Sequence, residues 1–562
     1  MAAVRMANEA QRVDFDPVTR VAGALSFQTT VDVEGGRVLE ASAVATLFRG
    51  YEVILEGRDP RDAIFVSSRA CGVCGGVHAT ASALALEMAF GIQPPPMGIV
   101  VRNLLVATEY LYDRPTHLFT RVGPDFSEAA VRETNPELWE RALRTPAPGG
   151  ATHGFALISD LMTAMTPFVG RLYTEALAMS RRAREAYVLL GGKYPHPQTI
   201  TPGGVSATVG TQDLQLMLLR VVEFFDYSQK VVAVWDDVVD FFFEADPRFR
   251  EVGQGPPNFI DLGQWDDPYA YDGTFETASS WGERRWSTPG AIVDGRLRTT
   301  DIQRVNMGVE EFVDHSFYED WSGGGSQSGN DPAGNPLSNR HPANKQTIPQ
   351  PGETHLAGKY SWSTAPRWDR QPMETGAYAR LWMTAIADKL PHRGFTEPTG
   401  HSLRLAIPQA QLPATVLEWR VPEHWGALER NRAQAYALAH SALVAYESLL
   451  LGLDLMRKGG PDAGVFTHYK IPKDLRHGTG LWGGSRGYLS HHVTLEDQVI
   501  QRYQIVAPST FTMSPRDAFG NSGPCEAAVV ATPLLSTAHP ERCIDVLRTI
   551  RSFDPCMSCA TH

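Results

Sequence analysis

Two short cysteine motifs are the residues of this chain best suited to chemistry. Cys71 and Cys74 form one C-x-x-C pair, and Cys556 and Cys559 form a second pair a few residues before the chain ends. A thiolate is a soft, strongly donating ligand, so two such pairs can supply four sulfurs to a soft metal centre. The motifs therefore predict a metal site assembled from both ends of the chain.

The cysteine count limits what else the chain can hold. The sequence has six cysteines in 562 residues, and the other two, Cys525 and Cys543, match no cofactor motif and are expected to be buried structural thiols. Six cysteines do not make a disulfide framework in a chain of this size. They also cannot supply several iron–sulfur clusters at about four thiolates each. Any long electron-transfer chain must therefore lie in another subunit.

Three other readings of the C-x-x-C pairs compete with this one. Each pair could be a thioredoxin-like dithiol, but neither lies in a recognisable βαβ unit. Together they could bind structural zinc, although zinc normally stabilises a local module and about 480 residues separate these pairs. They could also be ordinary core residues, but two such pairs by chance are improbable. The spacing favours a soft metal centre and leaves zinc open.

The elements that must position these motifs change in character along the chain. Alternating β-branched and polar residues predict strands in the first 50 residues, and a helical apolar period begins near residue 79. After about residue 464 the pattern returns to short strands and turns. Long amphipathic stretches lie between, at residues 154–190, 211–243, 376–389 and 427–457.

These patterns predict a mainly α fold with α/β ends. We expect an N-terminal strand-rich region over residues 1–78, a helical bundle region over 79–463 and a C-terminal α/β region over 464–562. Residues 322–357 are rich in Gly, Pro, Ser and Asn, which predicts an extended surface loop or a partner-contacting arm. The long-helix bundle would bring the N- and C-terminal cysteine pairs together.

Composition excludes several classes of partner. The formal net charge of −12 argues against nucleic acid or an anionic membrane as the principal partner. No run approaches about 18 apolar residues, so no segment is expected to span a bilayer. The first residues lack the apolar core of a secretory signal. We expect a cytoplasmic or cytoplasmic-membrane-associated protein, unless a partner carries an export signal.

The sequence around both cysteine pairs resembles the large subunit of nickel–iron (NiFe) hydrogenases. The family pattern R-x-C-G-x-C-x-x-x-H runs from Arg69 to His78, and D-P-C-x-x-C-x-x-H runs from Asp554 to His562. Other family stretches occur in the same order along nearly the whole chain: Asp16 to Arg20, Phe48 to Glu52, Gly57 to Asp62, Gly191 to His196, Lys359 to Trp362, Pro372 to Gly376 and Ser514 to Asp517.

The resemblance implies a nickel–iron centre held by the four cysteines. Cys74 and Cys559 would bridge the metals, while Cys71 and Cys556 would bind nickel terminally. In this family the iron carries CO and cyanide ligands. The reaction would be H₂ ⇌ 2 H⁺ + 2 e⁻, expected in the direction of H₂ oxidation. Electrons would pass to an iron–sulfur small subunit, and the heterodimers are expected to form a higher oligomer.

The resemblance also implies polar residues around the centre. A suspended arginine fixed by two carboxylates would place a rigid fork beside the substrate, and a histidine would hydrogen-bond a bridging cysteine. These residues would be Arg486 with Asp113 and Asp554, then His78, and two further cofactor contacts, Ser485 and Ser509. For an isolated Arg or Asp, a surface ion pair would be the better reading.

A structural magnesium is implied near the C-terminus. Its ligands would be Glu52, His562 and a backbone carbonyl near Val506. Magnesium favours oxygen ligands and retained waters, so one carboxylate with one imidazole is acceptable. In this family a maturation endopeptidase removes an extension after the last histidine. A chain that stops at His562 is therefore expected to be the matured form.

Three positions depart from the family pattern. Ala22 stands where a glutamate usually accepts the first proton, and alanine cannot relay one. Ser485 replaces a proline, and Arg114 replaces a histidine. These departures predict a divergent uptake or aerobic-type subgroup. The proton carrier stays open among ordered water, Glu374, His196, Asp14 and Asp16.

Two other functions are weighed against catalysis. A non-catalytic relative of the respiratory complex I type would share the fold but lack the metal-binding cysteines. A zinc-stabilised binding subunit would keep the cysteines and hold zinc alone. The four cysteines together with Arg486 argue against the first alternative, and metal content separates all three.

Overall fold

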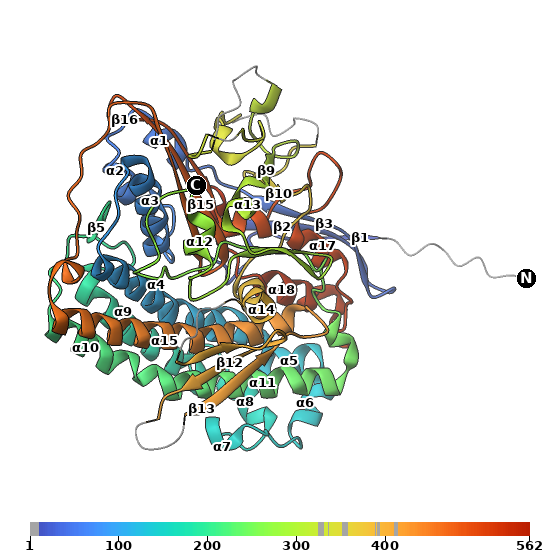
Figure 1. The fold of residues 1–562 in the computed structure, drawn as a ribbon. Coiled ribbons are helices and arrows are strands. Elements are labelled where there is room, and N and C mark those ends of the chain that lie inside the picture. Colours follow the sequence, from blue (N-terminus) through green and yellow to red (C-terminus); the bar gives the residue numbers. More distant parts are fainter. Residues whose placement is uncertain are drawn as a thin grey trace, which may run out of the picture.

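A layer of long helices forms the lower part of the molecule in Figure 1, drawn from the computed structural model. The structure describes residues 10–323, 331–334, 336–350, 358–387, 389, 394–409 and 414–562. The layer consists of α4 (Pro96–Thr116), α9 (Arg171–Gly191), α10 (Thr211–Val221), α11 (Glu223–Ala245) and α15 (Ala427–Lys458). Helix α15 packs against α4, α10 and α11, and α4 also packs against α9.

Helix α15 is the central member of this layer. It is the one helix in the described part of the chain that is long and apolar enough to cross a membrane. However, 72% of its apolar 18-residue stretch is buried inside the protein. Its apolar face therefore contacts other helices of the same chain, as in the core helix of a globular domain.

The predicted helix over residues 154–190 is wrong as a single element. The structure divides it into α8 (Ile158–Ala164) and α9, with Pro167 between them. Proline removes a backbone N–H and disfavours helical backbone in the residue before it, so the helix stops and restarts. Residues 211–243 likewise become α10 and α11, whereas residues 376–389 and 427–457 correspond to α14 (Ala377–Ala387) and α15.

The predicted N-terminal strands form a three-stranded antiparallel sheet. Its members are β1 (Gln11–Phe15), β2 (Leu25–Asp32) and β3 (Arg37–Ala45), in that order. The buried face of this sheet carries residues such as Phe27, Val31 and Ala43 and packs against α17 (Pro524–Val530) and α18 (Ile544–Ser552). The N-terminal strands thus pack against segments close to the second cysteine pair.

A second antiparallel sheet covers the helix that follows the first cysteine pair. It contains β14 (Arg476–Gly484), β15 (Gly487–Glu496) and β16 (Val499–Val506), and β14 lies on α3 (Gly75–Phe90). A Cβ atom at Gly480 would lie 1.8 Å from the Ala81 carbonyl oxygen, so only glycine permits this approach. Ser485 and Arg486 form the two-residue turn between β14 and β15. The sheet therefore carries Arg486 to the start of α3.

The stretch at 322–357, predicted as an extended surface loop or a partner-contacting arm, has buried side chains in its central part. Residues 324–330, 335 and 351–357 lie outside the described residues. The intervening segment returns to the protein, where His341 and Lys345 are 0% and 2% exposed. Hydrogen bonds and ion pairs made by these polar side chains hold the segment there, which composition does not reveal.

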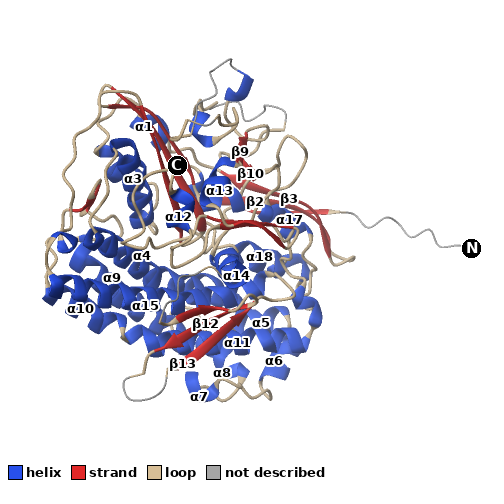
Figure 2. Cartoon of the chain, in the orientation of Figure 1, coloured by secondary structure: helices blue, strands red, loops and turns tan. Residues whose placement is uncertain are grey.

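Short sheets and helices connect these parts, and Figure 2 shows most strands above the helical layer, with β12 and β13 drawn across it. The connecting elements include β6 (Phe259–Asp261), β7 (Gly290–Val293), β8 (Arg296–Thr299), β9 (Val309–Phe312), β10 (Ala365–Trp368), β11 (Thr396–Pro398), β12 (Ser402–Ile407) and β13 (Thr415–Arg420). The larger apolar core draws residues from all three predicted regions, between Leu55 and Cys559. The boundaries between those regions stay a prediction.

Candidate metal centre

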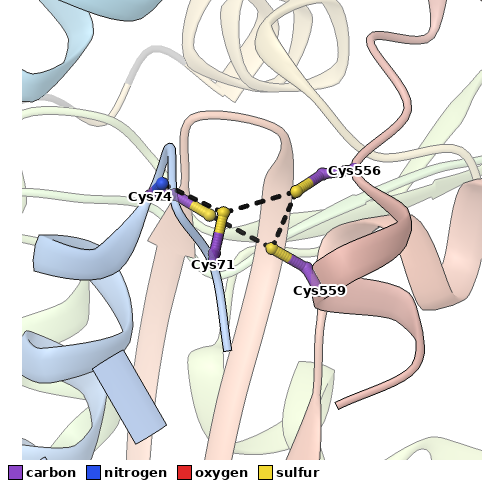
Figure 3. Close-up of side chains that lie close together, drawn as sticks. All are labelled: Cys71, Cys74, Cys556 and Cys559. Carbon is purple, nitrogen blue, oxygen red and sulfur yellow. Dashed lines mark hydrogen bonds between the residues drawn. The ribbon is translucent and has the colours of Figure 1, made fainter. Parts of the chain in front are cut away.

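The four cysteines of the two C-x-x-C motifs meet in one buried cluster (Figure 3). The Sγ atoms of Cys71 and Cys556 are 3.4 Å apart, those of Cys74 and Cys559 are 3.1 Å apart, and all four lie within 4.8 Å of one another. None of the four side chains is more than 6% exposed. The prediction that the fold joins these distant motifs is confirmed.

Local backbone geometry directs each sulfur into the cluster. Cys71 lies in the turn between α2 (Asp62–Ser68) and α3, and its Sγ accepts the backbone N–H groups of Val73 and Cys74 at 3.2 and 3.1 Å. Cys74 is the residue before α3. On the other side, the Cys556 N–H donates to Ser509 Oγ at 2.9 Å. Ser509 thus holds the backbone of a cluster cysteine.

The N-terminal segment is joined to the second motif by its backbone. The Ala22 N–H donates to the Pro555 carbonyl at 3.1 Å, and the Met557 N–H donates to the Ala22 carbonyl at 2.8 Å. These bonds form a parallel bridge between Ala22 and Cys556. Gly23 has a φ of +86°, and a Cβ there would lie 2.9 Å from the Ser558 nitrogen. Position 22 therefore lies beside the cluster, and its side chain there is a methyl group.

Arg49 links the two motifs directly. Its guanidinium donates to the Arg69 carbonyl and to the Ser558 carbonyl, each at 3.1 Å. One side chain therefore bonds the segments that carry both cysteine pairs. Sequence reasoning gave Arg49 no role, although it lies in the matched stretch from Phe48 to Glu52.

Arg486 is fixed by two buried carboxylates. Its Nη1 and Nη2 atoms lie 3.0 and 3.1 Å from the two oxygens of Asp113, and Nη2 also lies 2.9 Å from Asp554 Oδ1. The Ser485 hydroxyl donates to Asp113 at 2.8 Å and accepts from Arg486 at 3.0 Å. Burial alone would lower the pKa of Arg486, but the charges of Asp113 and Asp554 hold it well above its usual value. The arginine is therefore a fixed positive charge.

The electrostatics of the cluster are uneven. Burial raises the pKa of the Cys74 and Cys559 thiols well above the usual value. Hydrogen bonds from the neighbouring thiols, together with the charge of Arg486, hold the pKa of Cys556 well below it. A bound cation would favour thiolates at all four positions, because metal binding displaces thiol protons.

His78 lies one helical turn after Cys74 and is fully buried. Its Nδ1 is 3.1 Å from His491 Nε2, and His491 Nδ1 is 2.7 Å from the Tyr503 hydroxyl, which donates to Ser82 Oγ. Burial lowers the pKa of His78 to about 3, so the ring is neutral. Its Nε2 has no hydrogen-bond partner within the described protein. An imidazole nitrogen is thus available near the cluster, and the rest of the chain fixes its ring.

A second polar cluster adjoins the cysteines at the C-terminus. His562 Nδ1 lies 2.7 Å from the Cys559 carbonyl, and His562 Nε2 lies 3.1 Å from Glu52 Oε1 on α1 (Tyr51–Leu55). Glu52 also accepts the Ile505 N–H at 2.9 Å, and Val506 follows Ile505 at the end of β16. Burial opposes ionisation of Glu52, but the charges of Lys345 and His562 lower its pKa to about 2.

This second cluster suits a hard cation. A carbonyl only accepts hydrogen bonds, so His562 Nδ1 carries a proton, and Nε2 is the ring nitrogen that faces the Glu52 carboxylate. Glu52 Oε1 and His562 Nε2 are 3.1 Å apart, which matches the separation of adjacent ligands of an octahedral magnesium with bonds of about 2.1 Å. Lys345 Nζ lies 3.4 Å from Glu52 and 3.5 Å from Glu311. Sequence reasoning missed Lys345, because its segment has the composition of a loop.

Comparisons with known proteins agree with this geometry. A family profile described as nickel-dependent hydrogenase matches residues 49–137 and 165–562. The chain is 28% identical to the periplasmic NiFeSe hydrogenase large subunit of Desulfomicrobium baculatum, covering 100% of this chain and 96% of that protein. It is also 28% identical to the uptake hydrogenase large subunit of Bradyrhizobium diazoefficiens, covering 99% and 96%.

The fold comparison extends to solved structures. An actinobacterial-type NiFe-hydrogenase from Ralstonia eutropha H16 superposes with a TM-score of 0.95 at 38% identity, covering 98% of this chain and 100% of that chain. The NiFeSe hydrogenase of Desulfomicrobium baculatum superposes with a TM-score of 0.75 at 26% identity.

Proposed function

Since the chain belongs to the nickel-dependent hydrogenase family and is an oxidoreductase, we propose that it is the catalytic large subunit of a NiFe hydrogenase that oxidises H₂. The cluster of four buried cysteines from both ends of the chain carries this proposal. The similarity to an uptake hydrogenase large subunit supports the direction. The TM-score of 0.95 with an actinobacterial-type enzyme supports the proposal that the chain belongs to a divergent subgroup of the family.

The four thiolates would hold nickel and iron. All four sulfurs lie within 4.8 Å of one another. Cys74 and Cys559 would be shared by the two metals, and Cys71 and Cys556 would bind nickel alone. The bound group, with CO and cyanide on its iron, would supply the redox chemistry of H₂ cleavage. Thiolates suit such soft centres, and their burial keeps bulk water from the site.

The remaining residues would prepare the site around that group. Arg486 would hold one positive charge beside the cluster, because Asp113 and Asp554 leave its fork no freedom to rotate. His78 would hydrogen-bond a bridging sulfur through Nε2. Ser485 and Ser509 would fix the fork and the Cys556 backbone, respectively.

We also propose a structural magnesium held by Glu52, His562 and the Val506 carbonyl. The convergence of the Glu52 carboxylate and the His562 imidazole supports this site. Magnesium would neutralise the buried carboxylate next to the last cysteine. The cation would thereby hold the C-terminal segment against α1.

Electrons require a partner, and we propose an iron–sulfur small subunit. The chain has six cysteines, and the four in the cluster are the only thiols suited to a metal. Several of the similar proteins are named large subunits or large chains. The heterodimer, assembled further into a higher oligomer, would act in the cytoplasm or at the cytoplasmic membrane, unless the partner directs export.

Metal analysis with infrared spectroscopy of the purified complex tests the proposal. We expect nickel and iron near 1:1, bands from metal-bound CO and cyanide, and H₂-dependent reduction of a dye. Zinc alone, or metal-replete protein without those bands, would contradict the cofactor assignment.

A further inference from the structure

Cleavage of H₂ releases protons inside a buried site, so a titratable group must carry them out. Two nearby acids are committed elsewhere, because Asp113 and Asp554 both bind the Arg486 guanidinium. Ala22, beside Cys556, offers only a methyl group. A carrier supplied by this chain must therefore be another side chain.

The candidates left open by the sequence are poorly placed for this task. Both oxygens of Glu374 accept hydrogen bonds from Arg430 at 2.7 Å, so this side chain is held in a two-point contact with that arginine. Asp14 and Asp16 are exposed at the N-terminal sheet. His196 Nδ1 lies beside Gly75 without a hydrogen-bond partner in the described chain, but the ring is only half-buried and burial lowers its pKa, so it holds a proton less readily than an ordinary imidazole.

Glu109 is different from all of these. This residue of α4 is 0% exposed, and its Oε2 accepts the Gly76 N–H at 2.8 Å, two residues after Cys74. Its Oε1 has no hydrogen-bond partner, and no lysine or arginine forms an ion pair with it within the described residues. Burial raises the pKa of Glu109 well above its usual value, which favours the protonated form of this carboxyl group.

A second unpartnered group lies next to Glu109. The Tyr187 hydroxyl on α9 is buried and has no hydrogen-bond partner in the described chain. A Cβ atom at Gly76 would lie 2.5 Å from Glu109 Oε2 and 2.6 Å from the Tyr187 hydroxyl oxygen, so both oxygens contact the same glycine. The Tyr187 ring packs edge-on against Tyr194, whose hydroxyl donates to the Val73 carbonyl at 3.0 Å. Glu109 Oε1 and the Tyr187 hydroxyl are therefore two unpartnered polar groups beside the first cysteine pair.

We propose that Glu109 is the residue that carries protons from the four-cysteine site to the Tyr187 hydroxyl. The Glu109 carboxyl gives its proton to the Tyr187 oxygen as that hydroxyl gives its own proton to a solvent water molecule. The resulting carboxylate takes up the proton released at the cysteine site, so one O–H bond forms for each that breaks. The two electrons leave separately to the iron–sulfur partner. This inference rests on the proposed function.

The Glu109→Gln variant of the complete complex is the primary test. Glutamine keeps the shape and the acceptor for Gly76 but cannot exchange a proton. We expect H₂ oxidation to fall by about 100-fold or more, with unchanged nickel content and CO and cyanide bands. Exchange of D₂ with solvent protons should fall equally, while conversion of para-H₂ to ortho-H₂ persists. Glu109→Asp should recover part of the exchange rate.

A matched control is Glu526→Gln. Glu526 is also fully buried, and burial raises its pKa to about 7, but it lies on α17 and accepts hydrogen bonds from Ala43 and Tyr360. This variant should keep wild-type exchange. Normal exchange in Glu109→Gln would overturn the inference, and so would loss of nickel from that variant, because it would show a structural role. A wild-type complex without H₂ activity would instead overturn the proposed function.

Discussion

The carboxylates of Asp113 and Asp554 hold the Arg486 guanidinium from two sides, so a substitution of Arg486 can change the charge of this contact, its geometry or both. Its fork binds both Asp113 oxygens and Asp554, all nearly inaccessible to solvent. Lysine keeps the charge but has a single ammonium group, which cannot satisfy two carboxylates in this geometry. A lysine at position 486 therefore keeps the positive charge and removes the fixed geometry.

We expect Arg486→Lys to lower H₂ turnover by about 100-fold or more while the metals stay bound. Dye-reduction kinetics and metal content on the same preparation measure both effects. Arg248→Lys, at an exposed ion pair with Asp246, is the control and should behave as wild type. A normal rate in Arg486→Lys would refute a role for the fork.

The cysteines allow a similar comparison. Cys559→Ser should abolish retention of nickel and iron, because a serine hydroxyl stays protonated and does not replace a soft thiolate. Cys543→Ser should keep both metals, since Cys543 lies outside the cluster. Mass spectrometry measures the nickel and iron content of both variants. Full nickel content in Cys559→Ser would contradict the assignment of Cys559 as a metal ligand.

The sequence predicted the site residues that lie in short, recognisable motifs. The C-x-x-C spacing and the motif around Arg486 pointed to residues that the fold does bring together. The sequence did not predict roles for Glu109 and Lys345, because these roles depend on burial and on the partners that each side chain has or lacks. Those properties arise from contacts between segments distant in sequence.

At the scale of elements, the contact between α3 and β14 positions both the first cysteine pair and the Arg486 turn. It depends on Gly478 and Gly480, whose missing side chains let β14 lie on the helix backbone. Helix boundaries were harder to predict than helix identity. The break at Pro167 interrupts a continuous amphipathic pattern, and apolar periodicity does not register it.

Gly480→Ala should destabilise the protein by about 1–3 kcal/mol. An added Cβ would lie 1.8 Å from the Ala81 carbonyl oxygen, so β14 must move away from α3. Thermal unfolding of the complex and its H₂ oxidation rate should both decline. Gly394→Ala is the control, because no atom lies within 4 Å of the added carbon there. Equal melting temperatures for the two variants would contradict the packing argument.

Glu526 predicts a pH dependence at the contact between β3 and α17. Burial raises its folded-state pKa from 4.5 to about 7, so the unfolded chain ionises first as pH rises. This group therefore lowers stability progressively between about pH 4.5 and 7 and adds no further change above that range. We expect Glu526→Gln to lose less thermal stability than wild type between pH 5 and 8. Identical melting shifts would contradict a neutral buried carboxyl.

At the scale of the whole molecule, the sequence predicted strands at the N-terminal end, helices in the middle and strands near the C-terminal end, and the structure agrees in outline. It did not predict that the three regions would share one apolar core. Burial of His341 and Lys345 was also missed, because polar composition indicates solvent contact unless partners such as Glu52 and Glu311 are known.

The joining of the two chain ends at the cysteine cluster has a consequence for synthesis. Cys556 pairs with Ala22 through the backbone, and Arg49 bonds to the carbonyl of Ser558. A ribosome must therefore add 485 residues after Cys74 before the fourth sulfur exists. Until then the N-terminal half of the site lacks its partner sulfurs, and synthesis of Cys556 and Cys559 completes it.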